Sequence, residues 1–481
     1  MADQSLKDKT VKGTFWSAAD SILRYGVAFV VGVVLARLLS PDEYGLIGIL
    51  AVFIAIFEII IDGGLINALI RKTDAQEIDY CTVFYTNMVL SIAMALIIFF
   101  SASIIADFFE RQELVPLTQV MSCVVILHAL ALVPKARLTK LIDFKTQTEV
   151  SFIAAVISGV FGIVMAYMGY GVWALVGQQI SNAVVSAILF WIMNKWLPKF
   201  QFSMSSFKEM WSFGWKLLLS GIFNTVSTQL NQVVIGKCFS PATLGQFTRA
   251  QQFGSIFSGN LTTVIQRVTF PVLSEIQNDP EHLKAAYKRV IKVTVFPTFI
   301  LMMCLAACAK PLLMVLIGEK WIEASYLLQI LCFSMMLFPL HALNLNAIQV
   351  MGRSDLTLKV NIIKNLLMIF PIVVGILTNI YWMLLASTIR EFYCYYLNAY
   401  YTKTVLNYSV WEQIRDITPS IKVSCFVALP VYLLSFLPFN FYLLLVFQVI
   451  ASALLIGFIC EKTKYPEYVE LKGIMIQLIR R

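Results

Sequence analysis

The sequence predicts an all-α polytopic membrane protein with about fourteen transmembrane helices. Of its 481 residues, 59% are hydrophobic and only 14% are charged, whereas soluble domains average about 25% charged residues. The apolar residues form continuous blocks of about 20 residues, the length that an α-helix needs to cross a bilayer. Continuous blocks exclude an outer-membrane barrel, whose strands alternate apolar and polar residues.

An internal repeat predicts that the chain has two similar halves. The first copy holds Arg37, Ser40-Pro41 and Gly45, and the same spacing returns 200 residues later. Two weaker matches follow in the same order along the chain. The first match pairs the residues above with Lys237, Ser240-Pro241 and Gly245. The two weaker matches pair His128 with His341 and Trp173 with Trp382.

Each copy of the repeat contains six expected spans, which is an even number, so both copies have the same orientation. This predicts two six-helix lobes related by a pseudo-two-fold axis along the membrane normal, with two extra C-terminal helices. We expect an N-terminal lobe over 1–200, a C-terminal lobe over 201–408, and the last two spans with a cytoplasmic tail over 409–481. The expected spans lie near 14–38, 45–70, 82–106, 114–134, 149–169, 172–194, 212–238, 244–270, 290–310, 325–350, 358–378, 381–402, 418–437 and 440–460.

The lysines and arginines predict the orientation of these spans. Most of the 37 fall in the loops that lie on the same side as the N-terminus. Basic loops are typical of the cytoplasmic side, so both termini are expected there. The same loops account for the formal charge of +9, so we expect no nucleic-acid partner.

Charged residues inside the first two spans are the first candidate site. Asp20 and Arg24 are four residues apart and share a helix face. Glu58 and Asp62 repeat this spacing on the second span, and Arg24 is a candidate cation for them. Ionisable groups at this depth are costly unless they are paired or hydrated. The four residues therefore form either an ion-pair cluster that joins the two spans or a site that faces a hydrated cavity.

The eighth expected span carries a polar stripe on one helix face. Arg249, Gln252 and Arg267 belong to it, and Asn224 lies on the preceding span. Such a stripe fits the wall of a water-filled path. Guanidinium groups bind phosphate oxygens in a bidentate fork, so arginines along a cavity favour a phosphate-bearing substrate. The alternative is that Arg249 and Arg267 extend to opposite membrane surfaces.

Four further residues in the spans have two interpretations each. Arg390 and Glu391 are adjacent, so we expect them to point in different directions, not to neutralise each other, and to serve packing or coupling. His128 and His341 are either a symmetric pair of proton-binding groups or hydrogen-bonded packing residues. Sequence motifs for nucleotide hydrolysis, metal binding and nucleophilic catalysis are not evident. We therefore expect a transporter with no metal and no cofactor beyond a coupling H⁺ or Na⁺, and not an enzyme.

Five segments of the chain carry a resemblance to a known family. They are 35–45 (LARLLSPDEYG), 62–70 (DGGLINALI), 79–87 (DYCTVFYTN), 137–144 (RLTKLIDF) and 169–175 (GYGVWAL). These segments resemble the exporters of O-antigen, colanic acid and teichuronic acid, a polysaccharide branch of the multidrug/oligosaccharidyl-lipid/polysaccharide flippase superfamily. The resemblance covers the first 180 residues well and the remainder by architecture.

This resemblance implies a flippase for undecaprenyl-diphosphate-linked oligosaccharide in the bacterial inner membrane, acting by alternating access in surface polysaccharide biosynthesis. It implies that cavity cations bind the diphosphate, for which Arg24, Arg249 and Arg267 are the candidates, and that Asp42 and Glu43 belong to an outer gate. The implied partners are the lipid-linked oligosaccharide, membrane lipids, and the polysaccharide polymerase and chain-length proteins.

Two alternative functions remain open at this stage. A cation-coupled multidrug exporter of the same superfamily would use Glu58 and Asp62 to bind its ion or drug. A membrane-embedded glycan polymerase or ligase would need a large outer loop, and the expected loops are short.

Overall fold

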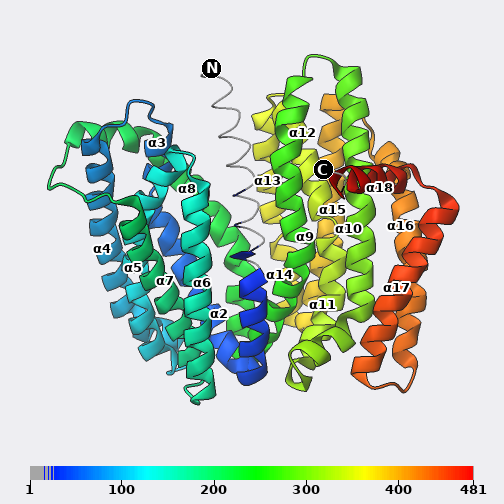
Figure 1. The fold of residues 1–481 in the computed structure, drawn as a ribbon, viewed down its shortest axis with the longest axis horizontal. Coiled ribbons are helices and arrows are strands. Elements are labelled where there is room, and N and C mark those ends of the chain that lie inside the picture. The colour runs from blue at the N-terminus through cyan, green and yellow to red at the C-terminus, as the bar shows by residue number, and fades with distance from the viewer. Residues whose placement is uncertain (1–15, 17–19, 21–22, 25, 480–481) are drawn as a thin grey trace. The chain divides into compact units, whose positions relative to one another are not determined.

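A computed structural model describes residues 16, 20, 23–24 and 26–479 of the chain (Figure 1). Inside its helices the side chains at 260–261, 263–265, 267–268, 270–272, 354, 471 and 474–479 lie outside the description. The described residues form helices and connecting turns, with no strand among them. This confirms the predicted all-α class.

The chain divides into two compact units at Gly245. The first unit opens with an apolar helix, Gly26–Leu38. Its remaining helices, blue to green in Figure 1, are α2 (Pro41–Asp62), α3 (Leu65–Arg71), α4 (Glu77–Phe109), α5 (Leu114–Lys140), α6 (Phe144–Tyr167), α7 (Trp173–Asn194) and α8 (Met204–Cys238).

The second unit begins inside α9 (Pro241–Glu275). Its remaining helices are α10 (Pro280–Leu316), η1 (Glu319–Trp321), α11 (Ile322–Met335), α12 (Phe338–Val350), α13 (Ser354–Leu366), α14 (Ile369–Leu377), α15 (Ile380–Leu406), α16 (Val410–Leu433), η2 (Leu434–Phe436), α17 (Phe441–Thr463) and α18 (Pro466–Ile479).

From the second onward, each expected span coincides with one helix or with consecutive helices. The first, 14–38, falls partly on residues outside the description, and its described residues are helical up to Leu38. In the described part of the chain, ten segments are long and apolar enough to cross a membrane. The expected spans outside this set fall on Gly26–Leu38, α8, α9 and α15, which are shorter or carry more polar residues. The chain is therefore a multi-pass membrane protein.

The second expected span is interrupted at Gly63-Gly64. Ser40 caps the start of α2 by accepting from the Glu43 backbone N–H, and Glu43 accepts from the Ser40 backbone N–H in return. At the other end, Gly63 and Gly64 have φ values of 54° and 67°, a left-handed conformation that glycine adopts without a Cβ penalty. The chain then continues as α3.

Helix α8 packs within the first unit, against α2, α3 and α4. A Cβ on Gly64 would lie 2.3 Å from the Gly214 carbonyl oxygen, so the two backbones are in direct contact. The repeat assigns α8 to the second half of the chain, whereas packing groups it with the first. The lobe boundaries at 200 and 408 describe the repeat and stay a prediction.

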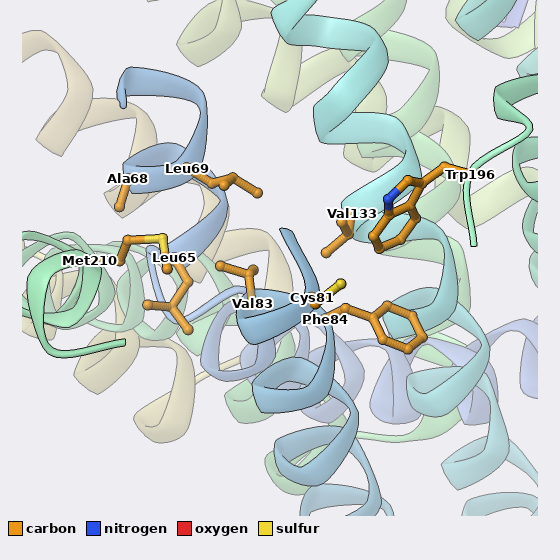
Figure 2. Packing of buried hydrophobic residues seen from close by; sticks show 9 residues of the cluster. All are labelled: Leu65, Ala68, Leu69, Cys81, Val83, Phe84, Val133, Trp196 and Met210. Atoms are coloured by element: carbon orange, nitrogen blue, oxygen red, sulfur yellow. The ribbon is translucent and has the colours of Figure 1, made fainter. Parts of the chain in front are cut away.

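An apolar cluster packs α3 against neighbouring helices of the first unit (Figure 2). It joins α3, α4, α5 and α8 with Trp196 from the segment between α7 and α8. The Trp196 indole N–H donates to Glu77, and the Ser203 backbone N–H donates to Thr82 Oγ1 at 3.1 Å. The connection to α8 is therefore anchored on α4. The buried members of the cluster are Leu65, Ala68, Leu69, Cys81, Val83, Phe84, Val133, Trp196 and Met210.

Candidate functional site

A group of ionisable side chains gathers at membrane depth in the first unit. His128 Nδ1 on α5 is in direct contact with Glu58 Oε1 on α2. Lys135, two turns further along α5, lies within electrostatic range of Asp20, Arg24 and Glu58. We call these five residues the charged cluster. The structure thus brings together three sequence-predicted residues, Asp20, Arg24 and Glu58.

The side chains of the charged cluster are partly or fully exposed. The side chains of Glu58 and His128 are 38% and 41% exposed, and Arg24 and Lys135 are exposed. Charged groups in contact with hydrocarbon are strongly unfavourable, so exposed charges at this depth indicate contact with water. This favours the hydrated-cavity interpretation over a sealed ion-pair cluster.

Sequence reasoning missed two members of the charged cluster. His128 was considered only as a partner of His341, because no sequence pattern relates it to Glu58. Lys135 was placed beyond the fourth span, whose end was expected near residue 134, whereas α5 continues to Lys140. Pro134 lies inside α5, and proline is a helix-end signal that tertiary packing overrides here.

Asp62 has a different environment from Glu58, despite the spacing of four residues. It is the last residue of α2, and its carboxylate lies near the Ile66 backbone, on the far side of the Gly63-Gly64 break. Its Oδ1 atom is buried without a hydrogen-bond partner among the described residues. Asp62 therefore lies next to the start of α3 and apart from the contact of Glu58 with His128.

A second polar network lies in the buried interior of the second unit. Glu391 on α15 is held by two groups: its Oε2 is 3.1 Å from His341 Nε2 on α12, and its Oε1 accepts from Arg390 NH1 at 2.9 Å. Asn398 Nδ2 lies 2.9 Å from His341 Nδ1. The Arg390 NH2 group also reaches the Lys364 carbonyl oxygen at 3.4 Å.

The expectation that Arg390 and Glu391 do not neutralise each other was wrong. Adjacent residues do leave a helix in different directions, but the long arginine side chain turns back to its neighbour. Both side chains are largely buried, with 16% and 17% exposed, so the pairing offsets part of the cost of placing each charge in the membrane.

The remaining predicted residues lie apart from these two networks. On α9, Arg249 donates a hydrogen bond to Gln252 one turn later. Gln246, at the start of the second unit, fixes α9 by donating to the Lys320 carbonyl oxygen at 2.7 Å. Asn224 is exposed on α8. Arg267 is on α9, but its side chain lies outside the described residues.

Asp42 and Glu43 occupy the first turn of α2. Asp42 Oδ1 lies 3.5 Å from Arg111 NH2, beside the turn between α4 and α5. Glu43 completes the capping box with Ser40. Both carboxylates have structural partners, and their part in an outer gate stays a prediction. Within the described residues, no group of three or more His, Cys, Asp and Glu could hold a metal ion.

An apolar pocket of about 420 Å³ lies in the second unit, between α10, α11, α15 and α16. Its lining includes Phe299, Phe333, Tyr396 and Ile421, and it is almost free of polar surface. Such a lining suits hydrocarbon and offers nothing to sugar or phosphate.

The fold is that of a known multi-pass membrane protein. Over 98% of this chain and 100% of the other, it matches a structure titled lipid II flippase MurJ, inward closed conformation, with a TM-score of 0.73 and 16% sequence identity. At this identity the match shows the fold alone.

Sequence comparison identifies the family. Residues 34–326 match the family described as polysaccharide biosynthesis protein. The lipopolysaccharide biosynthesis protein WzxC of Escherichia coli (strain K12) is 26% identical over 77% of this chain and 76% of its own length. The teichuronic acid biosynthesis protein TuaB of Bacillus subtilis (strain 168) is 23% identical over 73% of each chain. The chain belongs to this polysaccharide biosynthesis family, which confirms the resemblance found in the sequence.

Proposed function

We propose that the protein is a flippase that moves undecaprenyl-diphosphate-linked oligosaccharide across the bacterial inner membrane by alternating access, for the synthesis of a surface polysaccharide. The family and the names of its similar members support this substrate class. The distribution of lysine and arginine supports an orientation with both termini in the cytoplasm. The protein acts as a transporter and not as an enzyme.

The charged cluster of the first unit carries the proposal. The diphosphate is the charged group that every substrate of this class shares, and it must find cations inside the membrane. Arg24 and Lys135 are exposed at this depth, and Arg24 offers the planar fork that matches two phosphate oxygens. The carboxylates of Asp20 and Glu58 lie beside them, where they limit the positive charge when no substrate is bound, and His128 contacts Glu58.

The other predicted residues take supporting roles in this proposal. Arg249, oriented by Gln252, and Arg267 add cations for the diphosphate. Asn224, exposed on α8, offers an amide to sugar hydroxyls. Asp62 and Arg390 serve coupling, and Asp42 and Glu43 belong to the outer gate. The polysaccharide polymerase and chain-length proteins are the expected partners on the outer side.

The test is leaflet accessibility of a fluorescent undecaprenyl-diphosphate oligosaccharide in liposomes. The label is quenched from outside by a membrane-impermeant reductant, with protein-free liposomes as the control. We expect the protein to expose the inner-leaflet fraction of the label to the reductant within minutes. An inner-leaflet fraction that stays protected, together with export of a cationic dye under an ion gradient, would replace the flippase with a multidrug exporter.

A further inference from the structure

The second unit contains a buried pair of titratable side chains from different helices. His341 on α12 and Glu391 on α15 approach to 3.1 Å, and their side chains are only 11% and 17% exposed. The equivalent histidine of the sequence repeat, His128, also contacts a glutamate of its own unit, Glu58, but both of those side chains are about 40% exposed. The pair in the second unit is thus the one withdrawn from solvent.

The contact of His341 with Asn398 fits a neutral imidazole. The Asn398 amide nitrogen, which can only donate, lies 2.9 Å from His341 Nδ1. In this orientation of the amide Nδ1 accepts, and the single proton of a neutral imidazole belongs on Nε2, on the side of Glu391. Two atoms here, His341 Nε2 and Asn398 Oδ1, are buried without an aligned hydrogen-bond partner among the described residues.

A second proton on the imidazole would have acceptors on both sides. Turning the Asn398 amide by half a rotation places its unpartnered Oδ1 against Nδ1, which is the arrangement that a doubly protonated imidazolium requires. On the other side, Nε2–H already faces the Glu391 carboxylate, and a charged donor strengthens that contact. No displacement of a helix is needed for either change.

The surrounding groups determine the charge balance at this pair. From α15, Arg390 and Glu391 face His341, and from α13, Lys364 lies within electrostatic range. From α10, the buried Tyr287 contacts Thr402, one turn beyond Asn398. Thr402 in turn donates to Asn344 of α12 at 2.8 Å. The site therefore joins α12 to α15 through polar contacts, and a proton gained or lost there changes the contact between the two helices.

We propose that His341, Glu391 and Asn398 form a proton-binding site in the second unit, in which the Asn398 amide presents its nitrogen to the neutral imidazole and its oxygen to the imidazolium. The site takes one proton from water and returns it, with no other reactant. Its link to transport rests on the proposed function: the proton bound here changes the α12–α15 contact during the flipping cycle.

The chain has only three histidines, so the site can be observed directly. The full-length protein is labelled with ¹⁵N-histidine in lipid nanodiscs, and its imidazole resonances are followed by NMR from pH 5 to pH 9. Single substitutions H128Q, H282Q and H341Q assign the signals, and His282, exposed at the start of α10, is the reference. We expect the His341 resonance to convert to the doubly protonated form within this range. A His341 resonance that is unchanged from pH 5 to pH 9 would overturn the proposal.

Two substitutions of similar size separate a proton site from a packing contact. Asn398→Asp supplies an acceptor in either rotamer, so the His341 titration should move to higher pH. Asn398→Leu supplies none, so it should move to lower pH. Equal midpoints in both variants would exclude a role for the amide.

If the wild type flips lipid with a rate that depends on pH, H341Q should lose that dependence while H282Q keeps it. An identical pH profile in H341Q would exclude the link to transport, and a wild type that flips no lipid would count against the proposed function while leaving the NMR result intact.

Discussion

Gly45 lies against the backbone of Pro241, and the repeat makes the contact reciprocal, because Gly245 lies against Pro41. A Cβ on Gly45 would be 1.7 Å from the Pro241 carbonyl oxygen, and one on Gly245 would be 1.9 Å from the Pro41 carbonyl oxygen. The Ser-Pro segments, recognised in the sequence as two copies of one motif, thus pack on each other. Each glycine of the motif is required by the proline of the other copy.

Substituting either glycine should separate the two Ser-Pro segments. Because the Cβ would meet rigid backbone, Gly45→Ala and Gly245→Ala should each destabilise the protein by about 1–3 kcal/mol. Thermal unfolding in detergent measures the effect. Gly457→Ala, on a helix with nothing near the added Cβ, is the matched control and should be neutral or slightly stabilising. Equal melting temperatures for all three variants would show that the contact does not form.

The break between α2 and α3 provides a second comparison of neighbouring glycines. Both Gly63 and Gly64 have positive φ, but only a Cβ on Gly64 meets backbone, at 2.3 Å from Gly214. Gly63→Ala should cost about 1–2 kcal/mol from the left-handed conformation alone. Gly64→Ala should cost more, because α8 must also move. Unfolding measurements on the two variants check which one is less stable. If α8 did not approach the break, Gly64→Ala would be no less stable than Gly63→Ala.

Glu58 and His128 should act as a unit in transport, because their side chains are in direct contact. Glu58→Gln and His128→Gln each remove one partner, and the double substitution removes the pair. If the contact positions the charged cluster, each single variant should slow flipping, and the double variant should be no slower than the worse of the two. Rates from the liposome assay, with folding checked by size-exclusion chromatography, give the coupling. Strictly additive losses would mean that the two residues act independently.

The turn between α4 and α5 should show a small dependence of stability on pH. Lys237 Nζ donates to Glu110 Oε1 at 2.7 Å, and this hydrogen bond holds the pKa of the Glu110 carboxyl below its ordinary value. A lowered pKa in the folded state adds stability above the ordinary carboxyl pKa, and this stability is lost as the pH falls through the lowered value. The melting temperature of Glu110→Gln should therefore lie slightly below that of the wild type at pH 6, and the difference should shrink as the pH falls. A difference that does not shrink in acid would have another cause.

Much of the fold could be predicted because the length of an apolar segment can be read from the sequence alone. Blocks of about 20 apolar residues placed the expected spans from the second onward on helices of the structure, and the Ser-Pro motif identified two similar stretches of chain. What the sequence does not contain is which helices pack together. The repeat placed α8 in the second half, but the close approach of Gly64 and Gly214 holds it in the first unit.

The candidate site could be predicted only in part, because the sequence shows which residues share a helix face but not which helices are in contact. Spacing on one helix placed Asp20 with Arg24 and suggested Glu58, since residues four apart share a face. The pairing of Glu58 with His128, and of Glu391 with His341, depends on contacts between helices that no spacing reveals. The direct contact of Arg390 with Glu391 depends on the reach of a flexible side chain, which adjacency on a helix does not determine.

The measurement that tests the central claim most directly is the flipping rate of arginine variants in the liposome assay. The account predicts that Arg24→Ala and Arg249→Ala lower the rate at least about tenfold, because each loses a charge-assisted contact to the diphosphate. Arg24→Lys, which keeps the charge but not the fork, should fall between Arg24→Ala and the wild type. Arg353→Ala, which removes an exposed arginine paired with Asp355, should flip as the wild type does. Normal flipping by folded Arg24→Ala and Arg249→Ala would contradict the claim that these arginines bind the diphosphate.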